Sequence, residues 1–217
     1  MGEKLNCNFG DETFYYVGFF YTCHVTSLDN PYNNLTIDGY LGDPKEDVKA
    51  IYMNYKNTKY IPTNLGSVFN LTALRMDYIK LVEIKAKDFH GMLDLQFLSL
   101  RSNKLSSLPL DVFATLTKLR SIRLSGNQIE ELPNGIFENN LEMERIELDS
   151  NKIKYLGTDI FTVLKKLNFV YLRSNNCVDK QYDGSEAINQ LKNDIKMICK
   201  NTNEVPATTA TTTTQIQ

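Results

Sequence analysis

The spacing of four asparagines constrains this chain more than any other feature of its sequence. Asn103, Asn127, Asn151 and Asn175 follow one another at intervals of 24 residues. Each lies near the end of a similar stretch, and these stretches read LQFLSLRSNKL, LRSIRLSGNQI, MERIELDSNKI and LNFVYLRSNNC. A fixed period of this length indicates stacked structural repeats, each of which buries its apolar face against its neighbours.

The repeat continues upstream of the asparagines. LTALRMDYIKLVEI begins at Leu71 with Ile79 at the asparagine position, and VKAIYMNYKNTKYI begins at Val48, is one residue shorter and has Lys56 there. The sequence therefore predicts six repeats, which start at Val48, Leu71, Leu95, Leu119, Met143 and Leu167. The expected divisions are an N-terminal cap at 5–47, repeats of the 24-residue type at 48–176 with the sixth merging into the next cap, a C-terminal cap helix at 177–200 and a disordered Thr-rich tail at 201–217.

Each column of the repeat has a physical role. Alternate residues such as Ile51 and Met53 are expected to point inward from short strands, which stack into a parallel sheet. The asparagine amide is expected to hydrogen-bond free backbone groups where the chain leaves the strand, so we interpret the asparagines as structural. A phenylalanine recurs every 24 residues in the returning half of the repeat and predicts a stacked spine on the convex side. This column contains Phe89, Phe113, Phe137 and Phe161.

The two ends read as caps that close the apolar core of the array. TFYYVGFFYTCHV, near the N-terminus, is rich in β-prone residues. Near the other end, SEAINQLKNDIKMIC has apolar residues at helical spacing, and Ser185 is expected to cap that helix. The tract VPATTATTTTQIQ lacks core-forming residues, and it is expected to be disordered and to act as an O-glycosylated stalk or a linker.

The four cysteines fall in two pairs near the ends, Cys7 with Cys23 and Cys177 with Cys199. Four cysteines allow three connectivities, and local pairing is favoured because each pair would then close one cap. The alternative is four reduced cysteines in a cytosolic protein. The sequence contains no C-x-x-C motif and no Cys/His cluster, so we expect no site for zinc or another metal.

The paired cysteines and two N-glycosylation sequons favour a secreted protein. Asn34 and Asn70 each begin an N-glycosylation sequon, no apolar run is long enough to span a membrane, and the start of the chain shows no hydrophobic signal segment. We therefore expect the mature part of a secreted protein, with a cytosolic protein as the alternative. The net charge of −2 and the pI near 5.8 argue against nucleic acid or an anionic membrane as a partner.

No motif for nucleophilic, phosphate, dinucleotide or zinc-dependent catalysis occurs in the chain. The two histidines, His24 and His90, lie far apart in the sequence, and structural or solvated roles are favoured for both. The sequence therefore predicts a protein that is not an enzyme and needs no cofactor.

The outward strand positions, which would form the concave face of the sheet, combine arginines with aromatic residues, as protein interfaces do. Phe97 and Phe169 are expected to face solvent there, or alternatively to pack on arginine stems such as that of Arg145. The arginines would suit an acidic partner, unless neighbouring carboxylates neutralise them, among them that of Asp149. The predicted binding residues are Tyr52, Arg75, Asp77, Phe97, Arg101, Arg123, Arg145, Glu147, Phe169, Tyr171 and Arg173.

The pattern L-x-x-L-x-L-x-x-N-x-L resembles the extracellular leucine-rich repeat of the 24-residue animal type. The implied fold is an α/β solenoid: a horseshoe with a parallel concave β-sheet, an irregular convex side and disulfide-closed caps at both ends. From Cys7 to Cys199 the chain also resembles small secreted leucine-rich repeat proteins of insects, such as mosquito leucine-rich immune proteins. The shared features are the stretches YTCHV and DVKAIYM and the N-N-C at the sixth repeat. A Thr-rich tail stands where those proteins often carry a coiled coil.

This resemblance implies binding to other proteins outside the cell. The leading hypothesis is a secreted binding module that recognises an extracellular protein through its concave face, in innate immunity or cell-surface signalling. It predicts that Arg123→Glu or Phe97→Ala weakens partner capture without changing the melting temperature. The alternative hypothesis is an extracellular structural or self-associating matrix protein. The sequence predicts neither the identity of the ligand nor the oligomeric state.

Overall fold

The computed structural model describes residues 3–14, 18–28, 35–36, 49–53, 61–62, 65–68 and 70–199. For residues 3–14, 18–28, 35–36 and 67–68 the description is limited to the backbone. The predicted Thr-rich tail, Asn34 and the upstream Lys56 lie outside the described residues.

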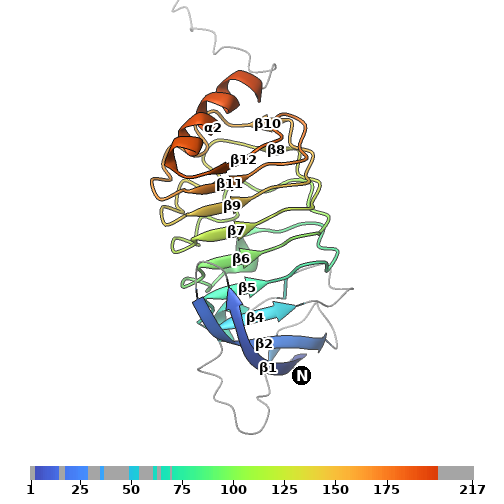
Figure 1. The fold of residues 1–217 in the computed structure, drawn as a ribbon. Helices are drawn as coiled ribbons and strands as arrows, with labels where there is room; N and C mark the ends of the chain where they lie inside the picture. The colour runs from blue at the N-terminus through green and yellow to red at the C-terminus, as the bar shows by residue number, and fades with distance from the viewer. Residues whose placement is uncertain are drawn as a thin grey trace, which may run out of the picture.

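A curved sheet runs along the length of the molecule and forms one side of a solenoid (Figure 1). Its consecutive repeat strands pair in parallel, each in register with the strand one repeat later. These strands are β4 (Ala50–Met53), β5 (Ala73–Arg75), β6 (Phe97–Ser99), β7 (Ser121–Arg123), β9 (Arg145–Glu147) and β11 (Phe169–Tyr171). From β5 onward each strand begins 24 residues after the last, so the solenoid expected from the period is confirmed.

The N-terminal segment extends this sheet at one end. β2 (Gly18–Leu28) pairs in parallel with β4, β1 (Glu3–Phe14) pairs antiparallel with β2, and β3 (Leu35–Thr36) pairs with β1. The β-prone stretch TFYYVGFFYTCHV contributes the end of β1 and the first part of β2, so it belongs to two antiparallel strands. The side chains of Cys7 and Cys23 lie outside the description, so their disulfide stays a prediction.

At the opposite end the sheet finishes on β12 (Gln181–Asp183), which runs antiparallel to β11. This strand has no counterpart in the repeat. It occupies the edge of β11, whose backbone groups would otherwise be open to pairing with another chain.

The interior is a single apolar column built from the inward strand positions and the returning segments. The central strand residues are fully buried, as the alternation predicts, and they are Ile51, Leu74, Leu98, Ile122, Ile146 and Val170. On the convex side the predicted phenylalanine spine is also present. The ring centroids of successive phenylalanines from Phe89 to Phe161 lie 6.2, 5.8 and 6.5 Å apart, and the last two pairs are stacked. Such contacts add modest stability beyond the buried area.

The convex side contains only short elements. They are the helix α1 (Leu65–Val68), the 3-10 helix η2 (Ala86–Phe89) and a two-stranded parallel sheet of β8 (Glu131–Leu132) and β10 (Tyr155–Leu156). Close packing between repeats requires glycine at Gly66, because a Cβ atom there would lie 2.3 Å from the carbonyl oxygen of His90. The next repeat therefore approaches the α1 backbone directly.

The asparagines hold neighbouring repeats together through the backbone, as predicted. Asn127 donates from Nδ2 to the carbonyl oxygens of Leu100 (2.9 Å) and Leu124 (2.8 Å), and its Oδ1 accepts from the amide of Leu105 at 3.1 Å. Asn103, Asn151 and Asn175 make equivalent bonds. Each side chain thus bonds two backbone carbonyl oxygens and at least one amide, and Asn103 accepts from two amides, those of Ile79 and Leu81. Successive asparagines share a carbonyl oxygen, as Asn103 and Asn127 share that of Leu100.

The residue before each asparagine adopts a left-handed conformation. The φ angles are 54° at Ser102, 73° at Gly126, 55° at Ser150 and 57° at Ser174. Tyr78 occupies the same column where the asparagine is replaced by Ile79, and its φ of 61° is uncommon for a bulky residue. The turn geometry is therefore a property of the repeat and persists without the asparagine.

The C-terminal cap is the helix α2 (Ser185–Ile198), which closes the last repeat (Figure 1). Ile188, Leu191 and Ile195 are buried beneath it, as the helical spacing predicts. The expectation that Ser185 caps this helix is wrong. The N-cap is Gly184, with a φ of 91°, because the chain turns directly from β12 into the helix through a conformation that glycine adopts readily.

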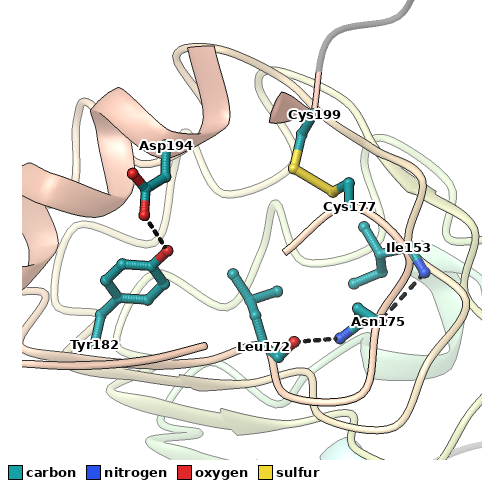
Figure 2. The surroundings of a disulfide bond; sticks show 7 residues. All are labelled: Ile153, Leu172, Asn175, Cys177, Tyr182, Asp194 and Cys199. Carbon is teal, nitrogen blue, oxygen red and sulfur yellow. Dashed lines mark hydrogen bonds between the residues drawn. A yellow bond between two sulfur atoms is a disulfide. The ribbon is translucent and has the colours of Figure 1, made fainter. Parts of the chain in front are cut away.

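The disulfide between Cys177 and Cys199 ties the end of α2 to the last repeat, as predicted (Figure 2). The Cα atoms are 5.2 Å apart and the cysteines are separated by 22 residues in the chain. Closing a loop of this length stabilises the folded state by about 3 kcal/mol in the chain-entropy model.

Asp194, on α2, joins the helix to β12 (Figure 2). Its carboxylate accepts hydrogen bonds from the Tyr182 hydroxyl (2.7 Å), the Gln190 amide (2.8 Å) and the Lys180 ammonium (3.0 Å). These donors, the Tyr182 hydroxyl first, lower the pKa of Asp194. Burial, together with the Asp194 carboxylate, raises the pKa of Tyr182.

Asp194 is expected to make the protein sensitive to acid. Because its folded-state pKa lies below the unfolded value of about 3.9, the ionised carboxylate stabilises the fold above that pH, and this contribution is lost as pH falls through the folded-state pKa. The free energy of unfolding, measured by urea titration across this range, should fall more steeply for the wild type than for Asp194→Asn. Parallel pH curves for the two proteins would contradict this role.

Candidate protein-binding face

The predicted binding residues lie on the concave side of the sheet in three columns. The register places Ala73 beside Phe97, Phe97 beside Ser121, and Arg145 beside Phe169. Neighbouring strands in a sheet lie about 4.8 Å apart, so members of one column touch each other. Their burial therefore depends on their neighbours as much as on the direction in which they point.

Phe97 corrects the expectation of a solvent-facing ring. It is 1% exposed and forms a small buried cluster with Ala50 and Ala73. The guanidinium of Arg123 lies over its ring, 5.1 Å from the centroid. The alternative of packing against an arginine therefore applies to Phe97. Alternation along the strand gives the direction of a side chain but not what covers it.

The most extensive side-chain network is centred on Arg145. Its guanidinium lies 4.3 Å from the ring centroid of Tyr171 and 5.4 Å from that of Phe169, and it donates to the Tyr171 hydroxyl at 3.0 Å. Glu147 Oε1 accepts from Arg145 (2.6 Å) and from Arg123 (3.1 Å). Arg145 and Glu147 are buried, whereas Phe169 and Tyr171 stay half-exposed above them. We call Phe169, Tyr171 and Arg145 the aromatic cluster.

A smaller network lies at the other end of the face. The guanidinium of Arg75 is 4.5 Å from the ring centroid of Tyr52 and donates to Asp77 at 2.8 Å. Asp77 is 1% exposed, and its Oδ1 also accepts from the Ser99 hydroxyl (2.6 Å) and the Arg101 amide (2.8 Å). Asp77 was predicted as a binding residue. Its burial and these bonds give it a structural role instead, because its hydrogen bonds connect two repeats.

Asp149 repeats part of this arrangement, since its Oδ1 accepts from the Arg173 amide at 2.8 Å. Desolvation raises the pKa of the Asp149 carboxyl, although the Arg173 amide opposes the shift. Burial likewise raises the pKa of Tyr171, against the nearby positive charge of Arg145. Sequence reasoning foresaw that carboxylates would neutralise arginines here, but not that two aspartates would also bind the backbone of the next repeat.

The face keeps a positive balance after these pairs are counted. Five arginines (75, 101, 123, 145 and 173) oppose four carboxylates, those of Asp77, Glu147, Asp149 and Asp183, which lies beside Phe169, and this leaves +1 on a chain of net charge −2. Arg173 is exposed and Arg101 is half-buried. Neither forms an ion pair within the part of the chain that the structure describes.

Sequence reasoning missed three serines on this face. Ser99, Ser121 and Ser125 are buried, and the hydroxyls of the last two make no hydrogen bond. The only sequence signal was that small polar residues occupy outward strand positions between arginines. Of the two sequons, Asn70 is exposed.

The described ranges contain no group of three or more His, Cys, Asp or Glu side chains arranged to hold a metal ion. In the same residues, no helix has the length and apolar character needed to cross a membrane.

Comparisons with known proteins agree with this fold. The leucine rich repeat family matches residues 69–129 and 119–176. A chain from the glycosylated form of the Toll–Spatzle complex of Drosophila resembles this one with 25% identity and a TM-score of 0.58, over 61% of this chain and 18% of that chain. A chain from a second structure of that complex matches with 18% identity and a TM-score of 0.48, over 64% and 26%. No curated protein matches.

This chain is a leucine-rich repeat protein, and the predicted fold class is confirmed. It spans about a quarter or less of the length of the two chains from the Toll–Spatzle complex. That complex is described as a molecular hub in Drosophila development and innate immunity.

Proposed function

We propose that this protein is a secreted, non-enzymatic binding module that recognises a protein partner through its concave face, in innate immunity or cell-surface signalling. The observation that carries the proposal is the aromatic cluster. Phe169 and Tyr171 keep half-exposed rings on a sheet, and Arg145 holds both from below through ring contacts and a hydrogen bond.

This arrangement suits a binding hot spot for two reasons. Large aromatic side chains contribute much of the energy at the centres of protein interfaces. Rings that are already fixed by a buried arginine lose little conformational entropy when a partner docks, so more of the contact energy is realised as affinity. The net positive charge of the concave face as a whole favours a partner surface with an acidic character.

Three observations support an extracellular setting. The disulfide between Cys177 and Cys199 is of the kind that persists in oxidising compartments. Asn70 is exposed and begins a glycosylation sequon. The similar solved chain with 25% identity belongs to the glycosylated form of the Toll–Spatzle complex. The likeness to insect immune proteins fits the same setting and remains a prediction.

Partner capture with matched variants tests the proposal. The double variant Phe169→Ala/Tyr171→Ala should retain less than about a tenth of the wild-type binding, because truncating a hot spot costs about 2 kcal/mol or more. The protein would be immobilised, exposed to extracellular fluid from its source, and the bound protein quantified by mass spectrometry. The control is Leu93→Ala, which removes a side chain that is 61% exposed and lies outside the concave columns.

Equal capture by the double variant and the wild type would refute the concave face as the binding face. If no partner is captured and the protein instead self-associates with rising concentration, the structural or matrix alternative is supported. Melting temperatures of all variants must be measured, so that lost binding is separated from lost folding.

A further inference from the structure

One column of the concave face follows a rule with one interruption, and its members are Asp77, Arg101, Ser125, Asp149 and Arg173. At two positions an aspartate accepts the backbone amide that lies 24 residues later: Asp77 accepts from Arg101 and Asp149 from Arg173, each at 2.8 Å. Between them the column contains Arg101 and Ser125. The amide of Ser125 has no such acceptor, because the arginine one repeat earlier has only donor groups on its side chain.

Unpaired donors gather at this interruption. Arg101 Nε and the Ser125 hydroxyl are both buried and form no hydrogen bond, and the Ser125 residue is only 6% exposed. The backbone of the two positions is joined directly, since the Ser102 amide donates to the Ser125 carbonyl oxygen at 2.8 Å. Buried polar groups are rarely left without a partner, so an unpaired guanidinium nitrogen and hydroxyl on adjacent repeats indicate that an acceptor is missing.

The missing group has a defined chemistry. Arg101 carries a positive charge and makes no ion pair among the described residues, and the surrounding face is positive overall. A carboxylate satisfies several donors at once and binds a guanidinium through two parallel hydrogen bonds. The Arg101 charge reaches Asp149, one repeat beyond Ser125, and opposes the rise in the pKa of its carboxyl. The two side chains form no ion pair among the described residues, and Asp149 Oδ1 is bonded to the Arg173 amide.

We infer that Arg101 and Ser125 form a subsite for an acidic side chain, Asp or Glu, of the protein partner. The inference rests on the proposed function, because the concave face must be the binding face. In the complex, the partner's carboxylate serves as the acceptor at Ser125, as Asp77 does for the Arg101 amide and Asp149 for the Arg173 amide. It accepts from the Arg101 guanidinium and from the hydroxyl or amide of Ser125.

A titration with acetate, followed by ¹⁵N NMR of the whole chain, tests the subsite without any partner. The Ser125 amide and the Arg101 Nε–H resonances should shift downfield and saturate with acetate, but not with chloride at equal ionic strength. Arg101→Asn should abolish the shifts, because the asparagine oxygen can accept the Ser125 amide itself. Arg173→Asn is the matched control, since the Arg173 amide is already held by Asp149, and it should titrate as the wild type does.

Each other outcome is decisive. Equal shifts with chloride, or acetate shifts that persist in Arg101→Asn, would overturn the subsite. A stronger response to sulfate than to acetate would overturn the assignment to a carboxylate. In partner capture, Arg101→Asn should bind about 10- to 100-fold more weakly, with a melting temperature no lower than that of the wild type.

The capture experiment also separates the two proposals. If Phe169→Ala/Tyr171→Ala loses the partner while Arg101→Asn binds as the wild type does, the concave face stands and the acidic subsite fails. If neither variant loses the partner, the proposed binding face fails as well.

Discussion

Phe97→Ala should lower the free energy of unfolding by about 3–5 kcal/mol, the usual cost of truncating a buried phenylalanine. Phe97 is 1% exposed, packs with Ala50 and Ala73, and lies beneath the Arg123 guanidinium. The substitution leaves a cavity beside two alanines that are too short to fill it. Chemical denaturation monitored by circular dichroism would measure the change.

Phe169→Ala is the matched control, because it removes the same side chain from the same column three repeats later. Phe169 is half-exposed, so its truncation should cost much less stability than that of Phe97. Equal losses for the two variants would show that Phe97 is not the better buried ring. The burial of Phe97 argues against the sequence-based expectation that Phe97→Ala would leave the melting temperature unchanged.

Asn127→Ala should also destabilise the solenoid, by about 2–3 kcal/mol. The alanine would leave the Leu105 amide without a partner, and an unsatisfied buried group costs about 1–3 kcal/mol. It would also remove one of the two hydrogen bonds accepted by each of the Leu100 and Leu124 carbonyl oxygens, which keep their bonds from Asn103 and Asn151. The midpoint and slope of a urea titration would give the loss directly.

Asn139→Ala provides the control for this effect, because Asn139 is exposed on the convex side. It should change stability by no more than about 0.5 kcal/mol. A stability loss at Asn127 no larger than at Asn139 would contradict the structural role of the asparagine column. Because Asn127 holds the Leu105 amide of the preceding repeat, its loss is also expected to raise hydrogen exchange at that amide.

The repeat period allowed much of the architecture to be predicted. The asparagines from Asn103 to Asn175, the phenylalanine spine and the inward strand residues each depend on contacts with the neighbouring repeat. Their roles follow from the period alone, because a repeated sequence places the same side chain in the same surroundings. The helix at the C-terminal end and its disulfide followed from local patterns in the same way.

The ends and the concave face were less predictable, because there the surroundings stop repeating. β12 and Gly184 belong to a single turn that no other repeat resembles. On the face, Phe97 and Phe169 share a column and a residue type, yet one is buried and the other half-exposed. Their different neighbours decide this, and neighbours across the sheet are 24 residues away in the sequence.

The sequence by itself determined that this chain stacks 24-residue repeats around an apolar column, because periodic burial and periodic backbone hydrogen bonding are encoded in each repeat. The tertiary structure alone decided which concave residues are accessible. Asp77 became a backbone acceptor, Arg145 a buried support for Phe169 and Tyr171, and Arg101 a side chain whose buried Nε has no acceptor. Charge pairing and burial are settled between strands, and the pattern along one strand does not contain that information.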